Sequence, residues 1–234
     1  MWDKAIEFLK TIKAWWNYRL LPRFRRDQPE NRRVLHAYRC VFVHIPKTAG
    51  SSIARALDQL PLRNGPDHPV IDTPKHAKAR ELRRILGRKR WNDYFTFAIV
   101  RNPWDLMVSC YEWWMQKADR FPHIADQMTE VRSLGSFEAF LRSPWGMERI
   151  NQFNGNIEDW FMDGDEQIVD FIARFENLDH DWPEICRHIG VEPFSIAHEN
   201  KTDRRDYRSY YTDETRELVA RRFARTIERF GYEF

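Results

Sequence analysis

One strand–turn–helix unit in the first quarter of the chain limits the possible folds more than any other feature. Residues 39–45 form a nearly continuous apolar run that stops at Pro46, which is typical of a strand buried on both faces of a parallel sheet. Small residues at positions 48–52 then make a tight turn, and a helix opens at Ile53. A buried strand that runs directly into a turn and a helix predicts an α/β fold.

The rest of the chain repeats this alternation of strands and helices. Residues 94–100 and 168–175 have the apolar composition of two further buried strands. The segment 61–75 reads as a long loop, and 119–150 reads as irregular with short helical pieces. The predicted helices are 77–86, 103–117, 182–189 and 212–229. Strands separated by helices predict a mostly parallel sheet.

The N-terminal residues are predicted to form a helix and linker (1–35) that precede the main domain (36–234). The helix is indicated by apolar residues at steps of three and four, namely Trp2, Ile6, Leu9, Ile12, Trp16 and Leu20. Basic residues flank this stripe, so residues 2–24 could lie peripherally on an anionic membrane surface. The alternative is a helix that packs on its own domain or on a second copy in a homodimer. Residues 27–33 read as the linker.

Cysteine usage and targeting signals set the expected compartment. The three cysteines, Cys40, Cys110 and Cys186, lie far apart, which fits a reducing compartment. No Cys/His spacing typical of zinc occurs, so no metal is expected. The chain shows no signal-peptide pattern and no run of about 18 apolar residues. We therefore expect a cytoplasmic protein, either free or peripheral at the inner membrane.

Charge is distributed unevenly along the chain. Lys and Arg number 38 against 35 Asp and Glu, and the net charge of +3 is too small to indicate nucleic-acid binding. Residues 1–40 carry +6 and residues 75–90 carry +7, whereas residues 151–200 carry −10. The excess at 75–90 predicts a positive surface near His76 that attracts an anionic acceptor or donor. The alternative is a set of solvated helix faces.

The turn after the first strand has the composition of a phosphate-binding loop. Backbone N–H groups in such a turn point at one anion, and the start of the following helix adds the positive end of its dipole. Glycine allows a close backbone approach, and lysine supplies a full charge. The residues predicted to bind phosphate oxygens are Lys47, Thr48, Ala49, Gly50, Ser51 and Ser52. The alternative is an ordinary turn in which a serine caps the helix.

This loop differs from a Walker A motif, which places its lysine after the last glycine and follows it with a Ser or Thr for magnesium. Here Lys47 precedes Gly50 by three residues, so catalytic magnesium is not implied. The second strand ends in Arg101, where a P-loop kinase usually has an acidic, metal-holding residue. Arg101, with Ser109 about two turns into the next helix, suits a second phosphate. These features predict a ligand with phosphates at two ends.

The two motifs resemble the sulfotransferase superfamily, whose donor is 3′-phosphoadenosine 5′-phosphosulfate. Residues 46–52 are similar to the family's loop for the 5′-phosphosulfate, and Arg101 and Ser109 match its pair for the 3′-phosphate. The sequences at 45–48 and 101–105 look closest to the bacterial and Golgi carbohydrate-type, family 2-like branch.

The resemblance extends to the C-terminus and covers about residues 38–234. Residues 198–202 are similar to a segment that closes over the donor, with Lys201 and Thr202 as donor contacts. The resemblance implies a P-loop NTPase-like fold of three layers, with a mostly parallel central sheet flanked by helices. It also implies transfer of a sulfuryl group to an acceptor hydroxyl on a glycan or glycoconjugate, without a metal.

In-line sulfuryl transfer needs a cation near the leaving phosphate oxygen and a base for the acceptor proton. Lys47 is the candidate for the first role. His76 is the candidate base, because carbohydrate-type relatives place a catalytic histidine in this interval and its basic neighbours favour the neutral ring. The alternative for His76 is a surface histidine that caps a helix. His44, inside the first strand, is expected to be a buried residue or a contact near the loop.

Three aromatic and acidic positions carry further expectations. Trp113 and Trp114 are adjacent on a helix, so at most one of them belongs to the core and the other faces the cleft. Glu176 follows the third strand and is expected to fix its turn rather than reach the ligand.

Two other functions stay open from the sequence alone. A divergent P-loop nucleotide kinase would need magnesium and ATP, and the position of Lys47 and the presence of Arg101 disfavour it. A non-catalytic, membrane-associated nucleotide-binding module would show no turnover. The full set of Lys47, Arg101, Ser109 and His76 disfavours that second alternative.

Overall fold

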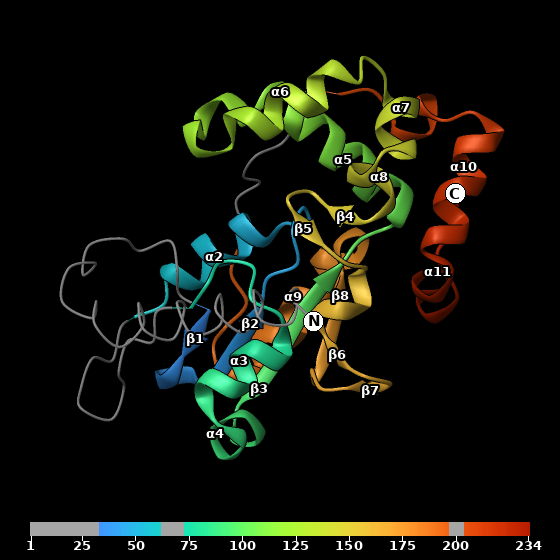
Figure 1. Cartoon of the computed structure of the whole chain (residues 1–234). Coiled ribbons are helices and arrows are strands. Elements are labelled where there is room, and N and C mark those ends of the chain that lie inside the picture. Colours follow the sequence, from blue (N-terminus) through green and yellow to red (C-terminus); the bar gives the residue numbers. More distant parts are fainter. Residues whose placement is uncertain (1–32, 62–72, 197–203) are drawn as a thin grey trace, which may run out of the picture.

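A four-stranded sheet lies at the centre of the computed structural model, which describes residues 33–61, 73–196 and 204–234 (Figure 1). In spatial order its strands are β1 (Val34–Leu35), β2 (Cys40–Val43), β3 (Phe95–Val100) and β8 (Phe171–Arg174). β2, β3 and β8 run parallel, and β1 pairs antiparallel with β2. The predicted, mostly parallel sheet is confirmed.

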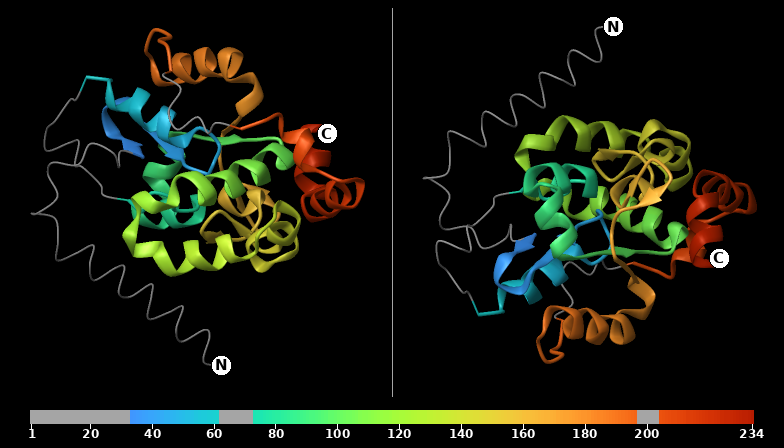
Figure 2. Two further views of the ribbon diagram at one scale, coloured as in Figure 1. Left: turned by 90° about the horizontal axis from the view of Figure 1, so that it is seen from above. Right: turned by 90° about the horizontal axis from the view of Figure 1, so that it is seen from below.

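Helices cover both faces of this sheet and give the three predicted layers (Figure 2). One face carries α2 (Gly50–Asp58) and α9 (Leu178–Ile189), and the other carries α3 (Ala79–Leu86), α4 (Arg88–Asp93) and α5 (Pro103–Gln116). Phe42 and Phe97 pack toward the first face, whereas Val43 and Ala98 pack toward the second. Successive strand residues thus enter opposite halves of the core, which is why the strands read as continuous apolar runs.

The segment between α5 and β8 is built from short elements that close one side of the molecule. Its helices are α6 (Ala125–Ser133), α7 (Phe137–Arg142) and α8 (Pro144–Met147). Two small hairpins follow, β4 (Arg149–Ile150) with β5 (Phe153–Asn154), and β6 (Met162–Asp163) with β7 (Glu166–Gln167). The three helices match the short helical pieces predicted between residues 119 and 150, whereas the two hairpins were not predicted.

The C-terminal helix predicted over residues 212–229 is wrong in one respect. The segment forms two helices, α10 (Asp213–Arg222) and α11 (Ala224–Phe230), with a break at Phe223. Phe223 leaves helical geometry at φ −106° and ψ 25°, and its side chain is buried in the core. The periodic pattern hid this bend because both helices present apolar residues to the same core.

The N-terminal prediction falls mostly on residues outside the described ones. Residues 1–32 are not described, so the helix at 2–24 and its membrane or dimer contact stay predictions. Val34 and Leu35, inside the predicted N-terminal segment, belong to the sheet, and Arg33, predicted as linker, is buried. A two-residue strand is too short to give a periodic signal. None of the helices in the described ranges is long and apolar enough to cross a membrane.

Candidate active site

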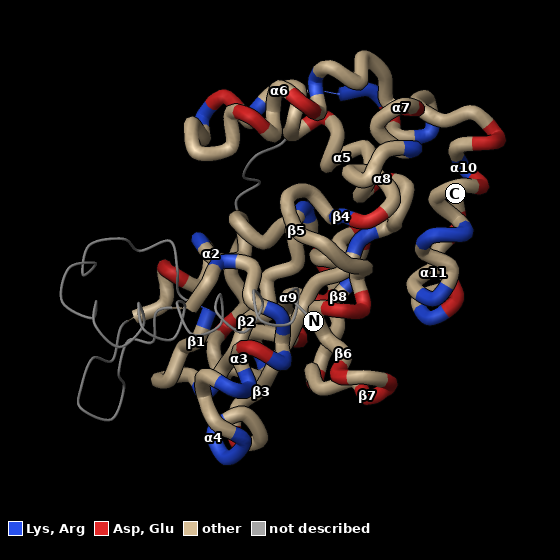
Figure 3. The backbone as a smooth tube through the Cα atoms, viewed as in Figure 1, with Lys and Arg blue, Asp and Glu red and all other residues tan. Residues whose placement is uncertain are grey.

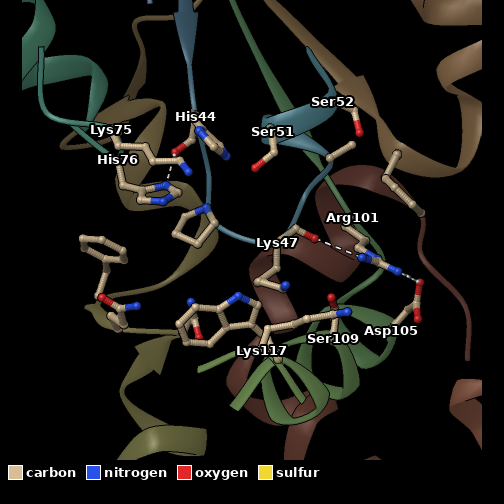
Figure 4. Close-up of a pocket in the computed structure, with 18 of the residues that line it drawn as sticks. His44, Lys47, Ser51, Ser52, Lys75, His76, Arg101, Asp105, Ser109 and Lys117 are labelled. Carbon is tan, nitrogen blue, oxygen red and sulfur yellow. Dashed lines mark hydrogen bonds and ion pairs between the residues drawn. The ribbon is translucent and has the colours of Figure 1, made fainter. Parts of the chain in front are cut away.

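A cleft lies at the carboxyl ends of β2 and β3, where open α/β sheets usually bind ligands (Figure 4). Its volume is about 1140 Å³, which exceeds the range of most single-ligand pockets. The turn after β2, the end of β3 and the segment 204–207 line part of it. The end of α5 and residues 151–153 line the rest. A cleft of this size can hold a nucleotide and a second substrate together.

The turn after β2 has the backbone strain that often marks functional loops. Lys47 (φ 66°) and Ala49 (φ 65°) both adopt the left-handed region that residues with a side chain rarely occupy. The Thr48 hydroxyl donates a hydrogen bond of 3.0 Å to the Ile45 carbonyl and closes the turn, and α2 begins at Gly50. Such strain persists only where the surrounding structure imposes it, and it concentrates at binding sites.

Gly50 is required by a neighbouring side chain. A Cβ atom at this position would lie 1.7 Å from His44 Nε2. His44 is buried and its ring stacks on Phe42 at 5.5 Å, as expected for a packing residue beside the loop. Burial holds the pKa of His44 well below its ordinary value, because a charged ring would be desolvated there. The His44 ring therefore packs directly against the backbone at the start of α2.

Lys47 extends into the cleft, as its predicted role requires. Its ammonium nitrogen lies 5.8 Å from the centroid of the Trp113 ring. Burial lowers the pKa of Lys47 to about 8, and the nearby cations Arg101, Arg204 and Lys117 lower it further, although Cys110 acts in the opposite sense. The cleft thus gathers positive charges that repel one another, and an anionic ligand would relieve this repulsion.

Arg101 is joined to the phosphate-binding turn by its guanidinium group. Nη1 donates a hydrogen bond of 3.0 Å to the carbonyl of Lys47, and Nε and Nη2 donate to Asp105 Oδ2 at 2.8 and 2.6 Å. The group also lies 4.1 Å from the centroid of the Phe175 ring. Ser109, two turns into α5, lines the same part of the cleft. The structure therefore brings the predicted pair of Arg101 and Ser109 next to the turn.

Arg204 is a site residue that the sequence patterns did not reveal. It forms an ion pair with Asp105, which thereby lies between two arginines. Its Nη1 atom is buried and has no hydrogen-bond partner in the described part of the chain. The one available signal was its position just after the predicted donor-closing segment 198–202. Because Arg101 and Arg204 share the single carboxylate of Asp105, this group of three side chains keeps a net positive charge.

One hydrogen bond to a backbone carbonyl fixes the ring of His76. Nδ1 donates to the carbonyl of His44 at 3.1 Å, so Nε2 is the unprotonated nitrogen of the neutral ring. Nε2 makes no hydrogen bond to any described residue. Burial lowers the pKa of His76 to about 3, and Lys75, Arg33 and Lys47 lower it further, against the opposing effect of the His44 carbonyl. His76 is thus a neutral ring that lines the cleft, and the alternative of a helix-capping surface residue does not fit.

The end of α5 and the two turns after it form a wall of the cleft that we call the α5 wall. Its residues are Trp113, Lys117, Arg120, Phe121 and His123. Trp114 is fully buried while Trp113 is partly exposed and lines the cleft, which confirms the expected division of this pair. The ammonium of Lys117 makes no hydrogen bond or ion pair with the described residues. The sequence predicted that one of the two tryptophans faces this cleft, but it did not single out Lys117, Arg120, Phe121 or His123. These four residues lie in a segment with weak periodicity.

The source of the positive charge in the cleft differs from the sequence-based expectation. Of the basic residues at 75–90, only Lys75 lines the cleft within the described part of the chain. The others lie on or beside α3 and α4 (Figure 3), where Lys78 pairs with Asp159 at 3.5 Å and Arg83 pairs with Asp163. Part of the acidic segment 151–200 therefore neutralises part of the basic one. Apart from Lys75, the positive charge in the cleft comes from Lys47, Arg101, the α5 wall, Arg204 and Arg205.

The remaining predicted residues have mixed outcomes. Glu176 accepts hydrogen bonds from the Asn102 N–H at 2.7 Å and the Tyr232 hydroxyl at 3.2 Å. It thus fixes the ends of two strands and the C-terminus, as expected for a structural role. Lys201 and Thr202, predicted to contact the donor, lie outside the described residues.

Comparison with known families decides the class of this protein. Residues 31–233 match the model of the Sulfotransferase family. The chain belongs to the sulfotransferase family. An uncharacterized protein of Archaeoglobus fulgidus is 28% identical over 112 residues, which are 47% of this chain and 79% of that protein. No solved structure matches the chain. This sulfotransferase is therefore an enzyme with an α/β fold. The residues that match the family model include both the strained turn and the C-terminal segment.

Proposed function

We propose that this sulfotransferase moves a sulfuryl group from 3′-phosphoadenosine 5′-phosphosulfate to an acceptor hydroxyl on a glycan or glycoconjugate. The observation that carries the proposal is the joining of two anion-binding groups in one cleft. Lys47 and the start of α2 form one, Arg101 and Ser109 form the other, and the bond from Arg101 to the Lys47 carbonyl links them. A donor with phosphates at two ends suits this pair.

The loop side of the cleft has the groups needed for the leaving phosphate. Backbone N–H groups at the start of α2 and the Lys47 ammonium would stabilise the negative charge that develops on the phosphate oxygen. The hydroxyls of Ser51 and Ser52 add donors at the same turn. We assign the 3′-phosphate to Arg101, Ser109 and Arg204, because the buried Nη1 of Arg204 has no hydrogen-bond partner among the described residues.

His76 is the proposed base for the acceptor. The acceptor oxygen forms a bond to sulfur, the bond from sulfur to the phosphate oxygen breaks, and the acceptor proton passes to His76 Nε2. The bisphosphate leaves with the electron pair of the broken bond. Because Nδ1 donates to the His44 carbonyl, Nε2 keeps a free lone pair for this proton. A bound, negatively charged donor would raise the pKa of His76 above about 3.

The α5 wall is the proposed acceptor-binding surface. Trp113 and Phe121 offer apolar ring faces on which sugar rings can stack, and Lys117 and Arg120 offer charges. The carboxylates that line the cleft within the described ranges are Asp105 and Asp206, and both form ion pairs with arginines. This distribution favours an acceptor that carries negative charge.

A screen with a donor labelled in its sulfuryl group tests the proposal. The panel holds neutral and anionic glycans and small hydroxyl compounds, with magnesium removed by a chelator. We expect label on at least one glycan and an equal amount of 3′,5′-bisphosphate. Lys47→Ala should abolish the transfer, whereas Lys89→Ala, at an exposed site on α4, should not. In a parallel assay with ATP and magnesium, phosphate transfer that stops when magnesium is chelated, together with no sulfuryl transfer, would establish the kinase alternative instead.

A further inference from the structure

Three hydrogen bonds fix the segment that carries His76. The ring donates from Nδ1 to the His44 carbonyl, as described above. Trp160 Nε1 donates to the carbonyl of His76 at 3.2 Å, and Arg33 Nε donates to the carbonyl of Lys75 at 3.2 Å. The peptide groups on both sides of His76 are therefore held by side chains from distant parts of the chain.

Arg33 is an unusual group to find in this position. Its side chain is 1% exposed, and its guanidinium carbon lies 5.6 Å from the centroid of the Phe42 ring. Nη1 and Nη2 have no hydrogen-bond partner in the described part of the chain. Burial lowers the pKa of Arg33 to about 10, against the opposing effect of Asp58, so the group is still charged at neutral pH. Burying a cation with so few partners costs stability, which calls for a compensating role.

The charges that act on His76 come from three segments. Lys75 precedes it in the chain, Lys47 belongs to the loop after β2, and Arg33 precedes β1. His44 also packs on His76, with ring centroids 4.3 Å apart, and burial keeps it neutral. Lys47 and Lys75 line the cleft, so the phosphates of a bound donor would neutralise their effect. Arg33 does not line the cleft, and its charge would persist in the complex.

We propose that Arg33 is a positioning residue for His76, which anchors the peptide group before it and supplies a buried positive charge that keeps the ring neutral with Nε2 free. The value of this role for catalysis rests on the proposed function. The contacts themselves do not. This role accounts for an arginine that is buried next to the edge strand β1 and does not itself line the cleft.

Nuclear magnetic resonance of the histidine ring nitrogens tests the proposal without donor or acceptor. Protein with ¹⁵N-labelled histidine is titrated from neutral pH toward the onset of acid unfolding, and the His76 signals are identified by their loss in His76→Gln. In Arg33→Gln we expect the onset of His76 protonation to move upward by about one pH unit. In Arg33→Lys, which keeps a charge, the shift should be clearly smaller. Arg84→Gln, an exposed arginine on α3, is the matched control and should leave His76 unchanged.

The remaining outcomes are also decisive. An unchanged His76 titration in folded Arg33→Gln, or equal shifts in Arg33→Gln and Arg33→Lys, would overturn the proposal. If Arg33→Gln does not fold, Arg33→Lys decides, because a shift of about one pH unit in this charged variant would overturn the proposal. A proton on Nε2 in the wild-type ring would also contradict it. If the His76 titration shifts as expected but the wild-type protein transfers no sulfuryl group, the proposed function is refuted and the role of Arg33 as a positioning residue stands.

Discussion

The guanidinium of Arg101 donates a hydrogen bond of 3.0 Å from Nη1 to the backbone carbonyl of Lys47. This bond joins the end of β3 to the strained turn after β2, and hence the two proposed phosphate sites to each other. Because Nε and Nη2 are paired with Asp105, Arg101 has a fixed orientation before any ligand binds. Prior orientation of this kind reduces the entropy lost on binding.

The first prediction concerns the planar shape of Arg101. Arg101→Lys keeps the charge but loses the paired bonds to Asp105 and the bond to the Lys47 carbonyl. We expect the dissociation constant of the 3′,5′-bisphosphate to rise by about tenfold or more. Calorimetry on the variant and on Arg84→Lys, an exposed control, measures this change. Equal wild-type affinity for adenosine 5′-phosphate and the 3′,5′-bisphosphate would refute the assignment of the 3′-phosphate to Arg101.

The second prediction concerns the stability cost of Lys47. Its pKa is about 8 in the folded protein against 10.5 for a free lysine, so the unfolded chain binds its proton more tightly. Lys47→Met should therefore lose activity and melt a few degrees higher than wild type at neutral pH. The gain should shrink as the pH rises from about 8 toward 10.5, because wild-type Lys47 is then neutral in the folded state. A melting point below that of wild type would contradict the expectation that the Lys47 charge destabilises the folded protein.

A third prediction links Lys47 to the pH dependence of donor binding. Below pH about 8 the Lys47 ammonium is charged, and bound phosphates should raise its pKa above that value. Above that pH, binding must take up a proton, so affinity for the bisphosphate should fall by up to about tenfold per pH unit. Calorimetry in buffers of different ionisation enthalpy counts the protons. Lys47→Gln should abolish the uptake, and equal uptake in that variant would assign it to another group.

The fourth prediction uses the contact between Gly50 and His44. Gly50→Ala places a methyl group where His44 Nε2 lies, so the variant should be strongly destabilised and should bind the bisphosphate weakly. His44→Ala creates space for that methyl group. In a double-mutant cycle, Gly50→Ala should cost less unfolding free energy in the His44→Ala background than in wild type. Additive losses would mean that backbone changes, rather than this contact, destabilise Gly50→Ala.

Local sequence was informative about the sheet and the loop for physical reasons. β2 and β3 are buried on both faces, so their apolar runs were unmistakable, and the turn from Lys47 to Ser52 is a contiguous motif. Arg101 and Ser109 lie in one strand–helix unit, so their spacing also survives in the sequence. Each of these features is decided by residues close together in the chain.

Long-range packing decides the features that the sequence did not reveal. Arg33 reaches Lys75 across 42 positions, and Arg204 reaches Asp105 across 99, so no local pattern could pair them. The bend at Phe223 depends on the core that receives its ring. Charge runs misled for the same reason, since Arg83 belongs to a basic run yet is paired with Asp163 on a distant hairpin.

The turnover of His76→Ala tests the central claim most directly. Wild type and variant are compared for transfer of the labelled sulfuryl group to the acceptor found in the screen, with His180→Ala as the control at an exposed histidine. We expect His76→Ala to bind the 3′,5′-bisphosphate as wild type does and to turn over about 100-fold more slowly, because only the proton acceptor is lost. Near-normal turnover in His76→Ala, at unchanged donor affinity, would contradict the role of His76 as the base.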